Sequence, residues 1–486
     1  MTPPLGLPLE IRDELPIGTG WRQVAGRAPV RFPYTGEVIA SAPVGSVADA
    51  ADAIEAAVEV RPQVAALPTH ERRRVLRETH ATLASEADAL ADLLVLETGK
   101  PLADCRTEVT RTLLTFEVAA EEAARITGET VPLDLLPSGE GLVGFWVRRP
   151  IGVVVGITGF NYPLLLAAHK VAPAIAAGCP IVVKPAPATP LASLHLVDVM
   201  RSVGVPPAAV QLVTGDAEVG DTLVRHDATA AVSFTGSAAV GHMIAANAGA
   251  KRVVLELGSN APLIVAADAD VAAAADACVR GGFYASGQAC ISVQRILVEE
   301  AVADRFVDAL ADRVRDVVVG DPREPDTQVA AVIDERAAAR IGDWIEAAVA
   351  GGAQRVVGGE IDGAVVAPTL LVDVPDGVSA WDEEVFGPVV CVRTVGSFDE
   401  AIETANRTAY GLHASVWTSD LARAFAAAER LEVGGVLVNE VPGFRADNMP
   451  YGGVKRSGLG REGPRFAIEE FTVTKMVMIR PTPAQT

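Results

Sequence analysis

Between residues 47 and 127, apolar side chains recur every three or four positions, which is the spacing of one face of an α-helix. We predict three amphipathic helices there, each with an apolar face that must pack on other elements. Their expected ranges are 47–60, 71–100 and 103–126. The proline-rich segment that precedes them is expected to be extended.

After residue 142 the pattern changes to short apolar runs that alternate with helical stretches. Runs that are apolar throughout indicate strands buried on both faces. A first block comprises 142–150, 152–158, 181–185, 210–215, 231–237, 252–258 and 261–266. A second block, after Cys290, comprises 293–298, 369–374, 389–395, 414–418 and 433–439. The alternation predicts an α/β fold with two parallel sheets covered by helices, and a ligand cleft where the two domains meet.

Two further segments, 131–151 and 468–486, are not placed in either sheet, and the second is rich in β-forming residues. An unpaired apolar strand near a chain end promotes aggregation unless it joins the sheet of a partner. We therefore expect contacts between subunits at these segments.

Composition and charge narrow the possible functions. The chain carries 41 Lys and Arg against 62 Asp and Glu, a net charge of −21, which disfavours binding to nucleic acid or anionic membranes. The apolar stretch 151–183 is interrupted by Asn, His, Lys and Pro, so a strand–helix–strand unit fits it better than a membrane span. The first residues lack the basic start and apolar run of an export signal.

The chain has five cysteines, Cys105, Cys179, Cys278, Cys290 and Cys391, scattered without a CxxC pair. This spacing supports neither a disulfide framework nor a zinc site. We therefore expect no bound metal and a reducing, cytoplasmic compartment.

Three residues carry candidate catalytic groups. Cys290 follows the glycine-rich stretch GGFYASGQAC, where a thiolate could attack a carbonyl group; the alternative is a buried structural thiol. Glu256 ends a predicted strand and would project into the cleft as a general base, unless it is an ordinary solvated glutamate. Asn161 follows another strand and could donate its amide to an oxyanion, or it is a turn residue that suits the backbone geometry.

Two motifs at strand ends suggest an anion site. Gly236, Ser237 and Gly241 open a helix after a predicted strand, where backbone N–H groups and the helix dipole favour a phosphate. Their GxxxxG spacing differs from the GxGxxG fingerprint of the ordinary dinucleotide fold. Lys184 ends a neighbouring strand and could contact a ribose or phosphate; helix capping and a solvated lysine are the alternatives. All five motifs lie where a predicted strand gives way to a turn or helix, which favours one shared site.

The chain carries, in this order, the motifs GFNYP, VVKPA, FTGS, LELGSNAP, GQACISVQR, EEVFGPV and MPYGGVKRSGLGREG. In these motifs it resembles the NAD(P)-dependent aldehyde dehydrogenase superfamily over nearly its full length. The resemblance implies two parallel-sheet α/β domains, one of them a modified Rossmann cofactor domain, and a small β oligomerisation arm. The implied cofactor domain comprises 1–130 and 152–256, the catalytic domain 257–450, and the arm 131–151 and 468–486. A homodimer or homotetramer that uses NAD or NADP is also implied.

The resemblance also implies catalytic roles for individual residues. Cys290 would be the nucleophile, Glu256 the general base, and Asn161 an oxyanion donor beside the backbone N–H of Cys290. Lys170 and Glu462 match positions that the family links to proton relay.

The same resemblance implies a set of cofactor contacts. Lys184 would contact the adenosine ribose and Ser237 the pyrophosphate. Glu384 would contact the nicotinamide ribose, and Phe386 would flank the nicotinamide ring. The full implied set is Lys184, Gly236, Ser237, Gly241, Leu257, Glu384 and Phe386.

The sequences FRADNMPYGG and CISVQR resemble the branch that contains lactaldehyde, phosphonoacetaldehyde and non-phosphorylating glyceraldehyde-3-phosphate dehydrogenases. Arg111 and Arg445 are therefore candidate contacts for an anionic substrate, and Phe160 and Tyr162 are further candidate substrate contacts. Ala289 stands where relatives with phosphorylated substrates tend to have Arg. A phosphorylated substrate is disfavoured, because a buried dianion would lack its Arg fork.

Cofactor choice and reaction type have open alternatives. Pro187 stands three residues after Lys184, where many NAD-preferring relatives have Glu, so NAD and NADP both remain candidates. A CoA-acylating dehydrogenase would intercept the thioester with a thiol and need no base, which Glu256 argues against. A thiol esterase, or a structural relative that kept the fold and lost the chemistry, would show no cofactor-linked oxidation.

Overall fold

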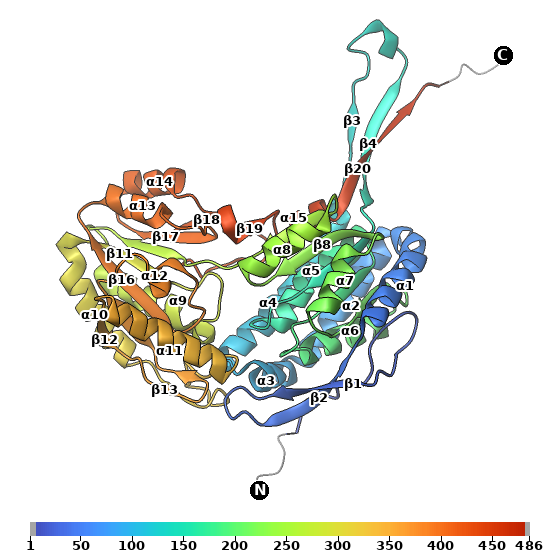
Figure 1. The fold of residues 1–486 in the computed structure, drawn as a ribbon. Coiled ribbons are helices and arrows are strands. Elements are labelled where there is room, and N and C mark those ends of the chain that lie inside the picture. The colour runs from blue at the N-terminus through green and yellow to red at the C-terminus, as the bar shows by residue number, and fades with distance from the viewer. Residues whose placement is uncertain (1–5, 482–486) are drawn as a thin grey trace, which may run out of the picture.

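The computed structural model describes residues 6–481 and contains two large α/β units, with a small antiparallel sheet projecting from one of them (Figure 1). One unit is built on a six-stranded sheet in the order β19-β9-β8-β5-β6-β7. Its parallel strands are β5 (Val153–Ile157), β6 (Ile181–Lys184), β7 (Val210–Leu212), β8 (Thr229–Thr235) and β9 (Arg252–Glu256). The edge strand β19 (Gly458–Leu459) pairs antiparallel with β9, so a late part of the chain completes this sheet.

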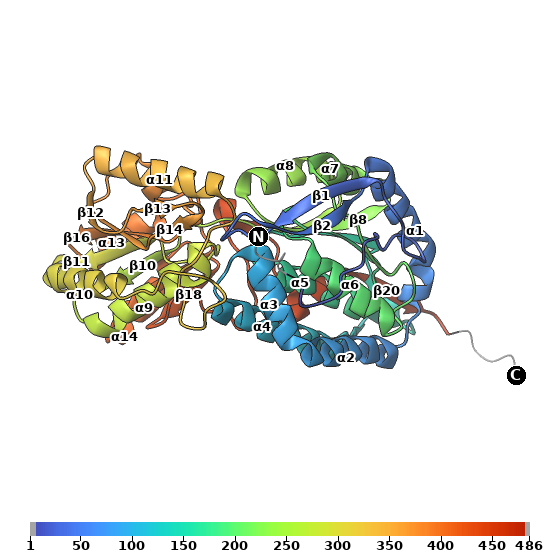
Figure 2. The same ribbon diagram turned by 90° about the horizontal axis from the view of Figure 1, so that it is seen from below.

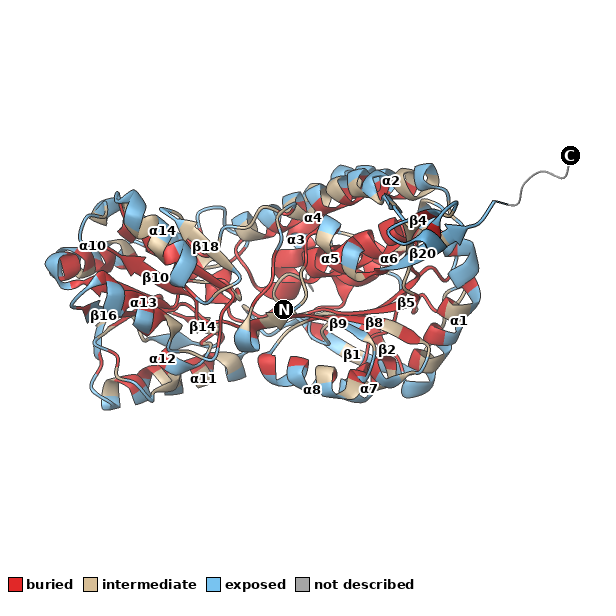
Figure 3. Ribbon diagram, turned by 90° about the horizontal axis from the view of Figure 1, so that it is seen from above, coloured by how far each residue is buried: buried red, intermediate tan, exposed pale blue. Residues whose placement is uncertain are grey.

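Helices cover both faces of this sheet (Figure 2). One face carries α1 (Val47–Ala65), α7 (Ala217–Arg225) and α8 (Ala238–Ala248). The other carries α5 (Pro163–Ala177) and α6 (Leu191–Ser202), with α2 (Thr69–Ser85), α3 (Ala87–Thr98) and α4 (Leu102–Glu122) packed outside them. Every residue of β5 and of α5 is buried, because both lie between other layers (Figure 3).

The second unit is built on a seven-stranded sheet in the order β12-β15-β16-β11-β10-β17-β18. Its parallel strands are β10 (Pro262–Val265), β11 (Arg295–Glu299), β15 (Thr369–Val372), β16 (Val389–Val395), β17 (His413–Trp417) and β18 (Gly435–Val438). The edge strand β12 (Gln354–Val357) is antiparallel, and β13 (Ile361–Asp362) and β14 (Val365–Val366) form a separate short hairpin. The helices of this unit are α9 (Val271–Phe283), α10 (Ala303–Arg315), α11 (Glu335–Ala350), α12 (Ser379–Asp382), α13 (Phe398–Asn406) and α14 (Leu421–Arg430).

Three strands form the projecting sheet, which we call the arm: β3 (Glu129–Val131), β4 (Val143–Pro150) and β20 (Thr472–Ile479). β20 pairs with β4 along its whole length, while Val473, Met476, Met478 and Ile479 are exposed. Helix α15 (Pro464–Glu470) occupies the start of the segment expected over 468–486, so the β-structure begins only at β20. Residues 482–486 of that segment lie outside the described residues. A role of the arm between subunits stays a prediction.

The structure differs from the expected elements in three places. The helix expected over 71–100 is broken at Glu86, which has a non-helical backbone and whose carboxylate contacts His195 Nε2 at 2.6 Å. The extended lead contains a hairpin, β1 (Gly26–Arg31) and β2 (Val38–Val44). The run 261–266, assigned to the first block, is β10 of the second sheet, because the chain crosses between the sheets in the short connection after β9. A crossover without a helix leaves no periodic signal.

Within residues 6–481, no helix combines the length and the apolar composition that crossing a membrane requires.

Candidate active site

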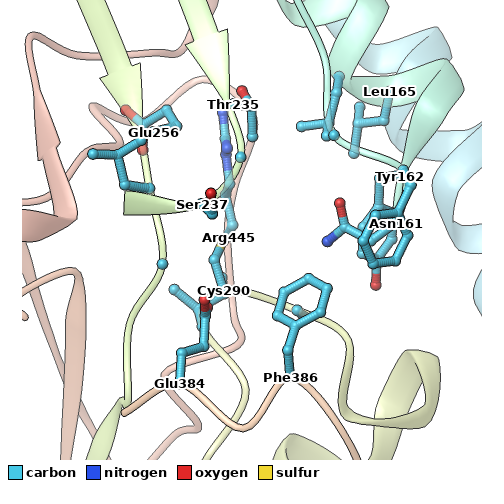
Figure 4. Close-up of a pocket in the computed structure, with 18 of the residues that line it drawn as sticks. Asn161, Tyr162, Leu165, Thr235, Ser237, Glu256, Cys290, Glu384, Phe386 and Arg445 are labelled. Atoms are coloured by element: carbon cyan, nitrogen blue, oxygen red, sulfur yellow. The ribbon is translucent and has the colours of Figure 1, made fainter. Parts of the chain in front are cut away.

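A cavity of about 470 Å³ lies between the two α/β units, at the carboxyl ends of β5, β8 and β9 (Figure 4). Both units contribute to its wall. The candidate residues that line it are Asn161, Glu256, Cys290, Gly236, Ser237, Leu257, Glu384, Phe386, Arg111, Phe160, Tyr162 and Arg445. The other candidates, Lys170, Glu462, Lys184 and Gly241, lie outside this wall. Residues 200 or more positions apart in sequence thus meet at one cavity.

Cys290 lies in the connection between the 3-10 helix η3 (Tyr284–Gly287) and β11. The expectation that it follows a strand is therefore wrong, and the glycines at the start of GGFYASGQAC belong to helix α9. Ala285 and Ser286 have positive φ angles of 50° and 55°. At Gly287 a Cβ would lie 2.1 Å from the carbonyl oxygen of Gly387, so only glycine allows this close approach. The loop is strained and tightly held.

The sulfur of Cys290 is half-buried and lies 3.1 Å from the hydroxyl oxygen of Tyr451. Burial raises the pKa of the Cys290 thiol to about 12, against the opposing effect of the Tyr451 hydrogen bond. The resting residue is therefore a neutral thiol, and its ionisation needs a change in its surroundings.

Asn161 lies between β5 and α5, at the end of the turn that leads into α5. Its Nδ2 donates a hydrogen bond to the carbonyl oxygen of Gln288, at 2.8 Å, in the loop of Cys290. The amide donor and the candidate nucleophile are thus held together, as the oxyanion role requires.

Glu256 ends β9 and is 3% exposed. Within residues 6–481, neither of its carboxylate oxygens has a hydrogen-bond partner. Burial raises the pKa of Glu256 well above its ordinary value, and the negative charge of Glu462 adds to the effect. The alternative of a solvated surface glutamate is excluded. A buried carboxyl group with free oxygens facing a cavity suits a general base that takes a proton from water.

Lys170 and Glu462 form a buried ion pair behind Glu256, with Nζ and Oε1 3.0 Å apart. Lys170 also donates to Thr235 Oγ1 at 2.7 Å. Burial alone would raise the pKa of Glu462, but the charges of Lys170 and His169 bring that pKa well below its ordinary value. Glu462 therefore stays ionised to a lower pH than its neighbour Glu256 does.

Helix α8 and strand β6 carry the candidate anion site. In the described chain, the Ser237 side chain precedes α8 without making a capping hydrogen bond to it. A Cβ at Gly241 would lie 2.3 Å from the Leu257 side chain, so glycine lets Leu257 pack against α8. Lys184 ends β6 and is 6% exposed, and burial lowers its pKa to about 8. A buried ammonium group and free helical N–H groups suit an anionic ligand.

Glu384 and Phe386 lie across the cavity from this helix, near Cys290 (Figure 4). Glu384 Oε1 accepts a hydrogen bond from the Ser259 N–H at 3.0 Å, and burial raises its pKa to about 7. The ring of Phe386 meets Phe160 edge to face at 5.6 Å. Together they form a wall with one carboxylate and an aromatic surface.

The two candidate arginines meet at one carboxylate. Arg111 binds Asp447 through two hydrogen bonds, at 2.8 and 3.1 Å, and Arg445 Nε lies 3.9 Å from Asp447 Oδ1. Arg445 also contacts Glu462 at 3.4 Å. Asp447 also contacts His169 Nε2 at 3.2 Å. Burial would raise the pKa of Asp447, but His169 and Arg111 lower it well below its ordinary value. One end of the cavity is therefore strongly polar and retains two guanidinium groups in its wall.

Sequence reasoning missed Tyr451, His169 and Asp447, all of which touch the site. Tyr451 and Asp447 lie inside the motifs FRADNMPYGG and MPYGGVKRSGLGREG, but neither has a pattern of its own that indicates a role. Their partners are far away in sequence. Among residues 6–481, no group of three or more His, Cys, Asp or Glu side chains is arranged to hold a metal ion.

Comparisons with known proteins identify the family. The aldehyde dehydrogenase family model matches residues 21–477. The 3-sulfolactaldehyde dehydrogenase of Priestia aryabhattai is 39% identical over 460 residues, which cover 94% of this chain and 96% of the relative. The lactaldehyde dehydrogenase of Methanococcus aeolicus is 38% identical over 455 residues, which cover 93% and 96%.

A solved structure agrees with these sequence matches. The crystal structure of a glyceraldehyde-3-phosphate dehydrogenase from Methanocaldococcus jannaschii, complexed with NADP, has a TM-score of 0.91 and 37% identity, covering 94% of this chain and 100% of that chain. The expected resemblance and the expected fold class are confirmed. The chain belongs to the aldehyde dehydrogenase family and is an oxidoreductase that acts on aldehydes.

Proposed function

We propose that the chain oxidises a small aldehyde to its carboxylic acid through a thioester on Cys290. The observation that carries this proposal is the meeting of Cys290, Asn161 and Glu256 at one cavity, each from a different element. The thiol proton of Cys290 first passes to water; the ionised sulfur then adds to the aldehyde carbon, and the resulting oxyanion is stabilised by the Asn161 amide and the backbone N–H of Cys290. Asn161 needs little movement, because it already donates into the Cys290 loop.

The proposed cofactor is NAD or NADP, which the residues of the site fit. Lys184, at the end of β6, offers a buried cation, and Ser237 offers a free hydroxyl at the start of α8. Glu384 offers an acceptor for ribose hydroxyls. When bound, the nicotinamide supplies the hydride acceptor that the oxidation needs. Phe386 and Phe160 shape the wall beside Cys290, where Phe386 would flank the nicotinamide.

Hydrolysis of the thioester is proposed to use Glu256 as the general base. Its two unpaired oxygens can accept the proton of a water molecule that attacks the acyl carbon. The proton then leaves Glu256 for solvent by way of the neighbouring Lys170–Glu462 pair, in which the charge of Glu462 raises the pKa of Glu256 and the charge of Lys170 lowers it. The relay role of this pair is thus a second step, after water activation.

Arg111 and Arg445 support a substrate that carries a hydroxyl or acidic group beside the aldehyde. Both line the cavity, and Tyr162 and Phe160 complete that part of its wall. Ala289 also lines the cavity, where it offers no charge to a phosphate. The relatives' names, which include sulfolactaldehyde and lactaldehyde dehydrogenases, fit this class of short polar aldehydes.

The test compares short, hydroxylated, carboxylated, sulfonated and phosphorylated aldehydes with both cofactors, and identifies the products by mass spectrometry. We expect cofactor reduction and a free carboxylic acid without added CoA, and no turnover in Cys290→Ala, which should still bind cofactor. Cysteine-to-alanine changes at Cys278 and Cys391 serve as controls, because both thiols are buried away from the cavity. Substantial turnover in Cys290→Ala contradicts the assignment, and CoA-dependent product formation favours the acylating alternative.

A further inference from the structure

Helix α4 contacts the loop of the candidate nucleophile. Asp104 Oδ2 accepts a hydrogen bond from the Ala285 N–H at 2.8 Å. Ala285 and Ser286 have positive φ angles, a backbone conformation that is costly for residues other than glycine. Such a conformation persists only where contacts hold it. Asp104 supplies one such contact, from outside the second α/β unit.

Glu108 lies one turn after Asp104 on the same face of α4, and its side chain caps helix α5. Its Oε1 accepts hydrogen bonds from the N–H groups of Leu164 and Leu165, at 3.0 and 3.2 Å. In the described chain, Tyr162 at the start of α5 makes no side-chain capping bond of its own. The buried carboxylate therefore satisfies free N–H groups and interacts with the helix dipole. Because Asn161 lies in the turn just before α5, Glu108 fixes where that turn ends.

Lys100 keeps the Glu108 carboxylate in place. Its Nζ donates to Glu108 Oε2, and its ammonium group lies 3.8 Å from the centre of the Tyr162 ring. The two charged side chains are 1% and 0% exposed. Removing the charge of one partner leaves the other buried and unpaired, which is strongly unfavourable. The pair is therefore rigid, and it is in direct contact with a residue of the cavity wall.

Asp104 and Glu108 are four residues apart on α4, so they lie on one face of the helix. We propose that these two carboxylates are positioning residues that set the separation between the Asn161 amide and the Cys290 sulfur. Asp104 holds the loop of Cys290 and Glu108 holds the start of α5, so α4 acts as the common support for both halves of the oxyanion site. This inference rests on the proposed catalytic roles of Asn161 and Cys290.

Glu97 provides a matched control, because it does for α6 what Glu108 does for α5. Its two oxygens accept hydrogen bonds from the N–H groups of Leu191 and Ala192, the first residues of α6, and it is fully buried. Helix α6 carries none of the proposed catalytic residues. Because Glu108→Gln also leaves the buried Lys100 ammonium group unpaired, rates are compared at temperatures equally far below the Tm of each variant, and a positioning role then slows only the Glu108 variant.

The first experiment compares Glu108→Gln with Glu97→Gln by single-turnover hydride transfer at saturating cofactor, with cofactor Kd and Tm measured in parallel. We expect Glu108→Gln to slow hydride transfer by about tenfold or more, because small misplacement of reacting groups has effects of this size. Glu97→Gln should stay within about twofold of wild type. Cofactor Kd should be unchanged in both. Equal slowing in the two variants, or no slowing in Glu108→Gln, overturns the proposal.

The second experiment uses Asp104, which is only partly buried and so tolerates change more readily. Asp104→Ala should lower kcat more than it raises KM, and Asp104→Asn should restore the rate, because its side-chain oxygen can still accept the Ala285 N–H. In an Asn161→Ala background, Glu108→Gln should have little further effect, since the group it positions is gone. If the effects of Glu108→Gln and Asn161→Ala on the rate are fully additive in the double mutant, the proposal is contradicted. Activity of Cys290→Ala would instead overturn the proposed function itself, so the two failures are distinguishable.

Discussion

The hydroxyl of Tyr451 lies 3.1 Å from the sulfur of Cys290, although 161 residues separate them in sequence. Burial raises the pKa of the Tyr451 phenol well above its ordinary value, so the hydroxyl stays protonated. It can therefore donate a hydrogen bond to a thiolate. The guanidinium carbon of Arg445 lies over the same ring, 3.8 Å from its centre. Tyr451 is therefore fixed as a hydrogen-bond donor towards the nucleophile.

Tyr451→Phe should make the Cys290 thiolate harder to form, because it removes the hydrogen bond that favours the charged sulfur. We expect alkylation of Cys290 by iodoacetamide to slow at every pH below the thiol pKa, and its pH profile to move upwards. Single-turnover hydride transfer should slow by about tenfold, in the range of one lost charge-assisted hydrogen bond. Tyr410→Phe is the matched control, since its hydroxyl binds Glu383 and lies away from the sulfur. An unchanged alkylation profile in Tyr451→Phe would show that the contact has no electrostatic effect.

Glu256→Gln separates oxidation from hydrolysis. If Glu256 acts only on water, the variant should give a rapid burst of reduced cofactor, about one per active site, and then very slow turnover. Rapid-mixing absorbance measurements resolve the two phases. Loss of the burst would mean that Glu256 also activates the cysteine, and unchanged steady turnover would remove it from catalysis.

The same carboxyl group predicts the direction of the pH dependence. Because burial and Glu462 raise the pKa of Glu256, the neutral acid predominates at lower pH and cannot accept a proton from water. Wild-type turnover limited by hydrolysis should therefore rise with pH through the raised pKa of Glu256. In Glu256→Gln, the slow turnover that follows the burst should no longer rise with pH in this way. A wild-type rate that falls as pH rises through neutrality contradicts this assignment.

Pro187 predicts that NADP is accepted. A glutamate three residues after Lys184 could bind the ribose hydroxyls of NAD and repel a 2′-phosphate, but Pro187 does neither, and it lies in an exposed turn. Lys184 remains as a nearby cation. We expect Pro187→Glu to lower kcat/KM for NADP and to spare that for NAD. A wild-type efficiency with NADP below about one hundredth of that with NAD, a gap of roughly 2.7 kcal/mol, would defeat the prediction.

The arm predicts an assembly that depends on its exposed apolar strand. Met476 and Met478 project from one face of β20 and are 38% and 63% exposed. Lysine at both positions should reduce the mass of the assembly in light scattering, because burying unpaired charge at an apolar contact is unfavourable. Ile361→Lys, on the short β13 hairpin, is a control for a general effect of surface charge. A mass equal to wild type would place the subunit contacts elsewhere.

The strand-end positions of Asn161, Lys184 and Glu256 could be predicted because short apolar runs mark the buried parallel strands that precede them. Cys290 could not be placed in this way. Its loop owes its shape to the close approach of Gly287 to another backbone segment, which periodicity does not encode. The break in the helical region at Glu86 was missed for a similar reason, since its partner His195 is 109 residues away.

The electrostatics of the site depended even more on distant contacts. Nothing local distinguishes Glu256, whose pKa burial and Glu462 raise, from Glu462, whose pKa Lys170 and His169 lower. Both are single glutamates in short motifs. Their opposite pKa shifts arise only when the chain brings four titratable groups together, so resemblance could suggest their roles but not these shifts.

The six-stranded sheet is completed at its edge by β19, which comes about two hundred residues after β9, the last of the other strands. On the ribosome, the seven-stranded unit can therefore complete its sheet while β9 still has an open edge and Glu256 still lacks the neighbour that raises its pKa. Tyr451 and Glu462 also emerge after the last strand of that second unit. A polypeptide cut short between 440 and 457 would hold every strand of the second sheet and the cysteine, but no working centre.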